Sequence, residues 1–210
     1  MAKYLIHTCN TRYWYVRNHL VPSMLKQGID GKDIHIHLDK ECMGNLKAFI
    51  DSLHWIQNNW LYEDGVWHLQ DDVIISHDFK QKTEYFDKGM VYGFESEYDK
   101  DQALWYSFPC IRIKNDIIPS FLKWLDEEAP KDTKLRSMIS NNKYDDALLM
   151  FWIRDYYKDY VVRLSPNIVD HVDWLIGGSV VNKQRSNKCV RSVSFKDEDL
   201  VIKLRRELYG

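Results

Sequence analysis

The chain lacks several features that each mark a particular class of protein. It has four cysteines in 210 residues, and no two of them form a CxxC pair. Widely spaced cysteines favour free thiols in a reducing compartment over a disulfide framework or a zinc knuckle. No apolar stretch has the length of a bilayer-spanning helix, and the chain does not open on a secretion signal. These absences predict a cytoplasmic protein without a transmembrane segment.

The overall charge excludes little by itself. A net charge of −2 at pH 7 gives no global reason to expect binding to nucleic acid or to an anionic membrane. Positive charge is concentrated at 183–210, which holds eight Lys and Arg against four Asp and Glu. This basic tail is interpreted as solvated surface with an amphipathic helix over 196–208. Contact with a membrane or a nucleic acid is the alternative.

The first half of the chain alternates between strand and helix patterns. Buried-strand patterns over 4–8 and 66–70 and a clean alternation over 34–38 predict strands, and the spacing over 14–27 and 45–58 predicts helices. A β-α-β-α-β order predicts a parallel sheet with crossover helices, hence an α/β fold. The composition, 45% hydrophobic and 29% charged, is that of a folded globular chain.

The second half is more mixed, and its polar segment 126–143 predicts a mobile loop. The remaining predicted elements are helices over 79–86, 117–125 and 145–157 and strands over 90–94, 104–113 and 160–164.

Polar side chains follow each of the first three predicted strands. Asn10 and Arg12 come after the first strand, Asp39 ends the second, and Asp71 and Asp72 follow the third. In parallel sheets ligands bind beyond the carboxyl ends of the strands. The three segments are therefore expected to converge on one edge of the sheet.

Adjacent carboxylates at the end of a buried strand are the strongest chemical signal. Asp71 and Asp72 repel each other and are desolvated, so a cation nearby would stabilise both. Mg²⁺ and Mn²⁺ take oxygen ligands of this kind together with substrate phosphates. The structural alternative is that one Asp caps the following turn while the other is solvated.

Two later segments add candidate groups. His171 follows the last predicted strand and is either a structural hydrogen-bonding group or a ligand, and imidazole suits Mn²⁺ better than Mg²⁺. Asp145 and Asp146 open an apolar helix, where the helix dipole favours carboxylates. The functional alternative for this pair is a general base that deprotonates a hydroxyl.

The segment 8–12 carries groups suited to a nucleotide. Arg12 offers a fork of donors for a phosphate or a base, and Thr8 and Asn10 lie beside it. Asp39 is a candidate acceptor for a base N–H or a ribose hydroxyl. Neither residue is specific evidence by itself.

Taken in order, these motifs resemble the GT-A glycosyltransferases, in particular small bacterial and phage members of that group. The shared motifs are the Thr/Arg segment 8–12, the strand that ends at Asp39, the carboxylates at 70–72, the helix start at 145–146 and the segment 166–171. The resemblance spans residue 4 to about 180. It departs at the metal motif, which is Gln-Asp-Asp here and not Asp-x-Asp.

The resemblance implies a single GT-A (Rossmann-like) domain over 1–182 with a mainly parallel central sheet flanked by helices. The nucleotide-binding half would cover about 1–95 and the acceptor half about 96–182, with the basic tail at 183–210. Asp72 and His171 would bind Mn²⁺ or Mg²⁺. Asp146, with Asp145 beside it, would be the catalytic base of an inverting enzyme.

The implied donor is a nucleotide-sugar, and the habit of the family favours a UDP-sugar. The acceptor would be a glycan, a lipid-linked glycan, a protein or a modified base in viral DNA. The residues expected to contact the donor are Thr8, Asn10, Arg12, Asp39, Gln70, Asp71, Ser179 and Arg185, the last two in a closing segment.

Two other interpretations remain open at this stage. A metal-dependent phosphohydrolase or nucleotidyltransferase would use Asp71 and Asp72 on the same sheet edge, and would need further carboxylates to activate water. A non-catalytic protein would bind the nucleotide-sugar without turnover.

Overall fold

Six strands form the central sheet of the computed structural model. In spatial order they are β2 (Ile34–Asp39), β1 (Lys3–Cys9), β3 (Gly65–Gln70), β6 (Cys110–Lys114), β5 (Met90–Tyr92) and β7 (Val161–Arg163). β1 is parallel to β2 and β3, and β5 is parallel to β7, whereas β6 is antiparallel to both of its neighbours. Every strand except β6 thus runs in one direction, which confirms the predicted mainly parallel α/β sheet. The structure describes residues 2–86, 88–96, 109–157, 159, 161–177, 191–192 and 194–210.

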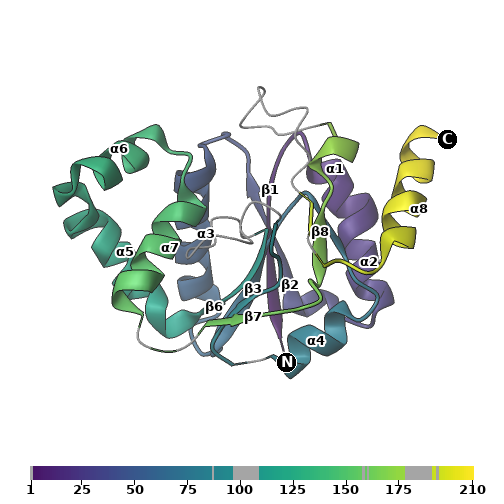
Figure 1. Ribbon diagram of the computed structural model, residues 1–210, viewed down its shortest axis with the longest axis horizontal. Coiled ribbons are helices and arrows are strands. Elements are labelled where there is room, and N and C mark those ends of the chain that lie inside the picture. The colour runs from purple at the N-terminus through teal and green to yellow at the C-terminus, as the bar shows by residue number, and fades with distance from the viewer. Residues whose placement is uncertain are drawn as a thin grey trace.

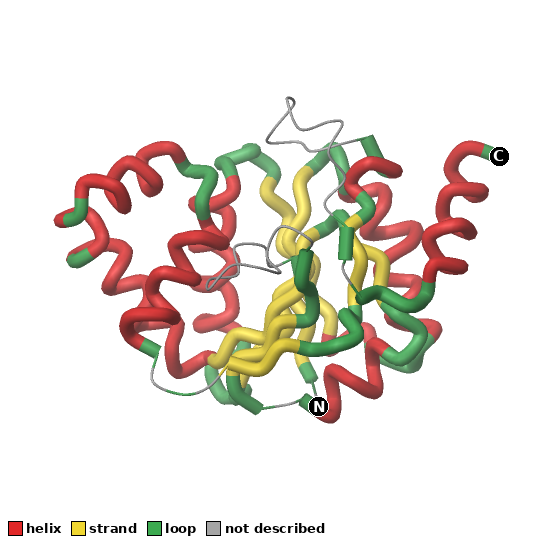
Figure 2. The backbone as a smooth tube through the Cα atoms, viewed as in Figure 1, coloured by secondary structure: helices red, strands yellow, loops and turns green. Residues whose placement is uncertain are grey.

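Helices cover both faces of this sheet (Figure 1), and Figure 2 shows the strands between the two helical layers. On one face lie α1 (Tyr13–Tyr15), a π-helical segment η1 (Val16–Leu20), α2 (Val21–Lys26), α4 (Phe79–Tyr85) and α8 (Glu198–Tyr209). On the other lie α3 (Asn45–Asn59), α5 (Ile118–Glu127), α6 (Thr133–Asn141) and α7 (Asp145–Tyr156). Single 3₁₀ turns are η2 (Gly31–Asp33), η3 (Asn115–Ile117), η4 (Ala129–Lys131) and η5 (Asp173–Leu175).

The strand β1 shows how the sheet separates two apolar cores. Successive side chains of a strand point to opposite faces. Tyr4 and Ile6 accordingly belong to the core under α1, α2 and α8, while Leu5 belongs to the core under α3, α5 and α7. All three side chains are at most 2% exposed. Burial on both faces explains why β1 reads as a continuous apolar run.

The helix predicted over 14–27 forms, and its two unusual residues have local consequences. Pro22 has no N–H to donate, and the turns before it, at Val16–Leu20, are of the wider π type. Gly28 has φ +80, in the left-handed region, and its N–H donates to the Leu25 carbonyl oxygen at 2.9 Å. Gly28 therefore ends the helix as expected.

The prediction of a loop over 126–143 was wrong, because this segment holds η4 and α6. The Asp132 carboxylate accepts from the Leu135 N–H at 2.9 Å and caps the start of α6. Asn142 ends the helix in the left-handed region at φ 53. No residue of α6 is fully buried, but Leu135, Met138 and Ile139 pack against the core under α3, α5 and α7. The polar composition of 126–143 concealed this short apolar face, and the two caps set where the helix begins and ends.

A second, two-stranded sheet was also missed. It pairs β4 (Val73–Ile75) with β8 (Val169–His171) in antiparallel register. The strand predicted over 104–113 begins at Cys110, and 104–108 lies outside the described residues. Within the described ranges, no helix combines the length and the apolar character that crossing a bilayer requires.

The amphipathic helix predicted over 196–208 is α8. Val201 and Leu204 are each 4% exposed and belong to the same core cluster as β1. Towards its end, the Tyr209 hydroxyl donates to the Leu175 carbonyl oxygen. The end of the basic segment is therefore packed against the domain.

Candidate functional site

The carboxyl ends of β1, β2 and β3 lie side by side, as the sequence predicts. Cys9 is opposite Asp39 in the register of β1 and β2, and His7 is opposite Gln70 in the register of β1 and β3. The turn after β3 then carries Asp71 and Asp72 to the same edge. The polar segments that follow the three strands are thus adjacent.

Arg12 and Thr8 hold the two carboxylates in place. The Arg12 guanidinium donates to Asp71 Oδ1 at 3.1 Å and also contacts Asp72 Oδ2. Asp71 Oδ2 accepts from the Thr8 hydroxyl at 2.8 Å and from the Cys9 N–H at 3.3 Å. Arg12 is only 5% exposed and both carboxylates are 8% exposed, so this charge cluster is nearly enclosed.

The small sheet brings His171 to the same cluster from the far end of the chain. His171 is opposite Val73 in the β4–β8 register, and the Val172 N–H donates to the Asp72 carbonyl oxygen at 2.7 Å. His171 Nε2 lies 3.1 Å from Asp72 Oδ2. Its Nδ1 lies 3.4 Å from Asp173 Oδ1, in ion-pair range but without the alignment of a hydrogen bond. Asp72 and His171, each predicted as a metal ligand, are therefore in direct contact.

The electrostatics of the cluster are set by burial and by these contacts. Burial and the neighbouring Asp72 raise the pKa of Asp71. For Asp72, burial would raise the pKa, but His171 and Arg12 together lower it below its usual range. For His171, burial by itself would lower the pKa. The contact with Asp72 has the larger effect and raises the pKa of His171 to about 9. The stable charge pattern at neutral pH is an ionised Asp72 between two cations.

The same residues fit a divalent cation. Asp72 Oδ1 is enclosed and has no hydrogen-bond partner within the described part of the chain. A buried carboxylate oxygen of this kind is costly unless something coordinates it. A neutral His171 imidazole would complete a mixed oxygen and nitrogen donor set, which suits Mn²⁺, so binding of the ion would displace the proton that His171 otherwise carries. Arg12 contacts the other oxygen of Asp72, so a bound ion would share that carboxylate with the guanidinium.

Three of the predicted donor-binding residues contact main-chain groups. The Asn10 amide donates to the Lys40 carbonyl oxygen at 3.0 Å. Asp39 accepts from the Met43 N–H through both carboxylate oxygens, at 3.2 and 2.9 Å. The Gln70 N–H donates to the Pro109 carbonyl oxygen at 2.8 Å, in continuation of the sheet. These contacts shape the loops around the cluster.

The start of α7 lies near the same edge, through a chain of contacts with the loop after β2. The Asn142 amide donates to the Met43 carbonyl oxygen and accepts from the Lys47 N–H at 2.9 Å, which joins the end of α6 to the start of α3. Three residues further on, Asp145 is hydrogen-bonded to Asn45. Since Met43 is itself bound by Asp39, the α7 start is connected to the end of β2.

Asp145 and Asp146 differ in their surroundings. Asp145 is 5% exposed, and burial raises its pKa. Asp146 is only partly buried, accepts from the Ala147 N–H at 2.7 Å, and its charge contributes to the raised pKa of the buried Tyr92 on β5. Of the two, Asp146 is the more exposed to solvent. Ser179 and Arg185, predicted for the closing segment, lie outside the described residues.

Two residues of the cluster were missed by the sequence reasoning. Asp173 contacts His171, as described above, and Tyr15 lies beneath the two carboxylates with its hydroxyl donating to the Val73 carbonyl oxygen at 2.9 Å. Burial, with Asp72 and Asp71 nearby, raises the pKa of Tyr15. The only sequence signal for Asp173 was its position two residues after His171, and nothing distinguished Tyr15 from other core aromatics.

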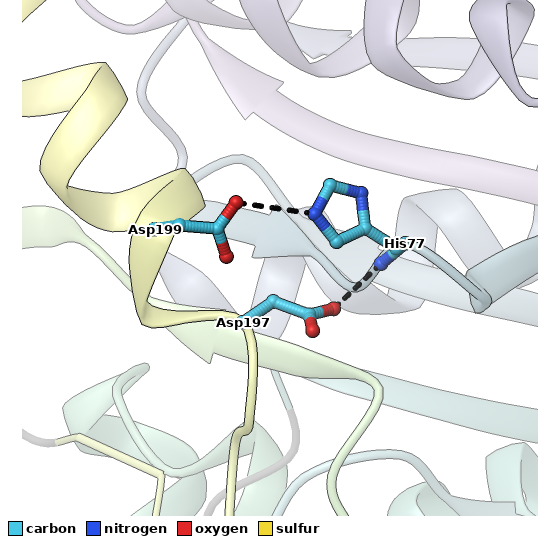
Figure 3. Close-up of side chains that lie close together, drawn as sticks. All are labelled: His77, Asp197 and Asp199. Carbon is cyan, nitrogen blue, oxygen red and sulfur yellow. Dashed lines mark hydrogen bonds and ion pairs between the residues drawn. The ribbon is translucent and has the colours of Figure 1, made fainter.

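A second group of metal-ligating side chains lies elsewhere, at the surface where α8 begins (Figure 3). The Asp197 carboxylate accepts from the His77 N–H at 2.7 Å, and His77 Nε2 is 3.3 Å from Asp199 Oδ2. The His77 and Asp199 side chains are 63% and 72% exposed. Each carboxylate is already engaged with His77, and the contacts attach the start of α8 to the segment between β4 and α4.

Comparisons with known proteins give distant likenesses only. No protein-family model and no curated protein matches the chain. Among solved structures, a glycosyltransferase involved in glycosylating the major capsid of PBCV-1 is 9% identical with a TM-score of 0.47, covering 98% of both chains. The galactosyltransferase LgtC, solved with donor and acceptor sugar analogues, is 10% identical with a TM-score of 0.47, covering 99% of this chain and 96% of that one.

A third solved structure has a different activity. A putative glucose-1-phosphate thymidylyltransferase from Bacillus anthracis is 12% identical with a TM-score of 0.48, covering 94% of this chain and 98% of that one. With each TM-score below 0.5, the likenesses are too distant to decide an activity.

Proposed function

We propose that the chain is a metal-dependent glycosyltransferase that moves a sugar from a nucleotide-sugar, a UDP-sugar by preference, to an acceptor hydroxyl with inversion. The proposal is supported chiefly by one observation. Arg12, Asp71, Asp72 and His171 come from three distant parts of the sequence and meet in one enclosed cluster at the carboxyl edge of the sheet. A cluster of this composition is suited to a cation and a diphosphate.

Each residue of the cluster has a separate proposed role. Asp72 and His171 would hold Mn²⁺ or Mg²⁺. When bound, the ion would supply positive charge to offset the charge that develops on the departing diphosphate. Arg12 would bind a phosphate oxygen of the donor in addition to its contact with Asp71. Thr8 fixes the orientation of Asp71 through its hydroxyl.

The proposed base is Asp146. It stands at the start of α7, which the contacts of Asn142 and Asp145 place at the same edge of the sheet as the cluster. As base it would take the proton of the acceptor hydroxyl as that oxygen bonds to the anomeric carbon and the bond to the diphosphate breaks. Asp145 is buried and hydrogen-bonded, so its proposed role is to hold the helix start in place.

The proposal is tested by ligand binding with and without metal. UDP-, GDP-, dTDP- and CMP-sugars are each added with Mn²⁺ or with EDTA, and thermal unfolding is followed. A ligand at a hundredfold excess over its dissociation constant stabilises the folded state by about 2.7 kcal/mol. We expect a Mn²⁺-dependent rise in the unfolding temperature with one nucleotide class, followed by sugar transfer when an acceptor is supplied.

Two substitutions separate the metal site from the base. Asp72→Asn should abolish the Mn²⁺-dependent shift, whereas Asp146→Asn should keep the shift and lose transfer. Asp33→Asn is a matched control, because Asp33 is a buried carboxylate paired with Lys3 at 2.6 Å near the opposite ends of the strands. An unchanged shift in Asp72→Asn would contradict the metal assignment, and full transfer by Asp146→Asn would contradict the base.

A second activity is favoured by one observation and is read out in the same experiment. Asp173 adds a third carboxylate next to His171, and further carboxylates are what a metal-dependent phosphohydrolase or nucleotidyltransferase would use to activate water. Release of phosphate or pyrophosphate from a nucleotide without sugar transfer would favour that activity. Binding without any turnover would favour a non-catalytic nucleotide-sugar-binding protein.

A further inference from the structure

A cavity of about 610 Å³, open to solvent over much of its boundary, lies between α5, the second half of α7 and the end of β6. It is lined by four aromatic residues, Trp124, Trp152, Tyr156 and Tyr157, together with charged side chains. Its volume is within the roughly 300–1,000 Å³ typical of small-ligand sites. Nothing in the proposed transfer reaction uses these residues.

The cavity is remote from the Asp72 cluster. Lys114, which lines it, is opposite Gly65 at the beginning of β3. Asp71 and Asp72 follow the other end of the same strand. A strand of this length extends about 20 Å at about 3.3 Å per residue. The cavity and the cluster therefore lie at opposite edges of the sheet, and one small ligand cannot occupy both.

The aromatic rings offer flat apolar faces at the cavity. The Trp152 and Tyr156 rings are nearly parallel, at 14° with centroids 6.4 Å apart, and the Trp124 ring lies 6.1 Å from Tyr156. Both tryptophans are packed into the core, at 4–5% exposed, whereas Tyr156 is 50% exposed. A half-exposed ring backed by two indoles matches the C–H face of a pyranose.

The charged rim selects against anions. The lining holds two lysines against four carboxylates. Both lysines are already paired within the lining, Lys114 with Asp116 at 2.9 Å and Lys123 with Glu127 at 3.7 Å. Glu128 of the lining is paired in turn with Lys131, just outside it, at 2.7 Å. Because both lining lysines are already paired, the described part of the rim offers no unpaired cation to a phosphate or a nucleotide. The carboxylate oxygens that remain are hydrogen-bond acceptors for hydroxyl groups.

From this combination we infer that the α5–α7 cavity binds a neutral glycan, with a pyranose ring against Tyr156 and its hydroxyls hydrogen-bonded to the carboxylates of the rim. Such a site would retain a carbohydrate chain on the protein at a distance from the Asp72 cluster. The inference does not depend on transferase activity, since it concerns binding of a neutral sugar without nucleotide or metal.

The test uses the full chain with ¹⁵N-labelled tryptophan in EDTA. Methyl glucoside, methyl galactoside, N-acetylglucosamine and lactose are titrated in turn, and the indole N–H resonances of Trp124 and Trp152 are followed by NMR after assignment with single Trp→Phe variants. We expect saturable shifts of these two resonances with at least one sugar. Tyr156→Ala should weaken that binding at least tenfold, whereas Tyr85→Ala, which removes a 78% exposed ring on α4, should not.

Several outcomes would overturn the inference. One is the absence of shifts at Trp124 and Trp152 with every sugar up to its solubility. Another is equal binding by Tyr156→Ala and the unchanged chain. A third is stronger binding of glucose 6-phosphate or of a lysine-rich peptide, which would identify an anion or peptide site. Because the titration is done in EDTA without nucleotide, failure of the proposed transferase activity would leave its result unaffected.

Discussion

Replacing Arg12 with Met removes the only charge on that side chain while keeping an unbranched apolar chain of similar reach. In the folded protein the guanidinium contacts Asp71 and Asp72, which are both 8% exposed. Among the described residues, the substitution therefore leaves two adjacent buried carboxylates with His171 as their remaining cationic neighbour. Removing one partner of a buried ion pair is costly because the other charge stays desolvated and uncompensated.

The expected cost can be bounded. Breaking a buried pair from one side typically costs about 3–5 kcal/mol. For a chain of 150–250 residues each kcal/mol shifts the unfolding temperature by about 2–4 °C, so Arg12→Met should lower it by about 6–20 °C. The loss of stability should be smaller at mildly acidic pH, because Asp71, whose pKa is already raised, can then take up a proton. The loss of stability should also be smaller with Mn²⁺ present, since a divalent cation would replace the lost positive charge.

Differential scanning fluorimetry and urea unfolding at pH 7, each with Mn²⁺ and with EDTA, measure both effects. Arg112→Met is the matched control. Arg112 is 3% exposed, which is comparable to Arg12. Its carboxylate partner Asp64 has a side chain that is 61% exposed, so the substitution leaves no buried carboxylate without its ion-pair partner at that site. The control should lose stability without gaining a response to Mn²⁺. A loss below about 1 kcal/mol in Arg12→Met, or an equal Mn²⁺ response in both variants, would refute the account of the cluster.

Three further predictions concern stability. Burial lowers the pKa of His7 to about 4, so the unfolded chain takes up a proton first as pH falls below about 6.5, and stability should drop by about 3 kcal/mol by pH 4. His7→Gln should show a shallower fall in urea midpoint across that window, and identical pH profiles would contradict the assignment. Asp132→Ala removes the cap of α6 and should cost about 0.5–2 kcal/mol. Faster amide exchange confined to that helix would show it, and unchanged exchange would exclude the capping role. Gly65→Ala would place a Cβ 2.6 Å from the Ile113 carbonyl oxygen and should cost about 1–3 kcal/mol of stability in urea unfolding. Gly31→Ala is the control and should be nearly neutral, because the atom nearest to its added Cβ is 3.8 Å away. Equal losses of stability in the two variants would refute the predicted clash.

The sequence predicted the first half of the fold well because that half is regular. The strands that begin at Lys3 and Gly65 carry short apolar runs, and the strand that begins at Ile34 alternates apolar and polar residues. Such patterns are local properties of the sequence. α6 was missed because its apolar face is short, with Leu135, Met138 and Ile139 set in a polar segment, and because its ends are set by the caps Asp132 and Asn142. β4 and β8 are three residues each, too short for a period to be recognised.

Only the site residues that follow strand ends could be predicted to lie close together. Asp71, Asp72 and Arg12 could be assigned to one edge from the order of elements alone. The direct contact of His171 with Asp72 depends on the β4–β8 pairing, which joins segments almost a hundred residues apart. Pairing at that separation leaves no mark in local composition, and the same holds for the position of Tyr15 under the carboxylates.

The pairing of Asp170 with Arg191 has a consequence for how the chain is completed during synthesis. Asp170 lies next to His171, is fully enclosed, and accepts from the Arg191 guanidinium and from the Ser192 N–H at 2.8 Å. Until Arg191 has left the ribosome, this carboxylate has neither partner, and until α8 follows, the core beside β1 lacks Val201 and Leu204. A nascent chain that ends before Arg191 would therefore carry the whole Asp72 cluster in sequence and yet be a poor folding unit. Sites for fragment expression or split-protein complementation should be chosen with this dependence in view.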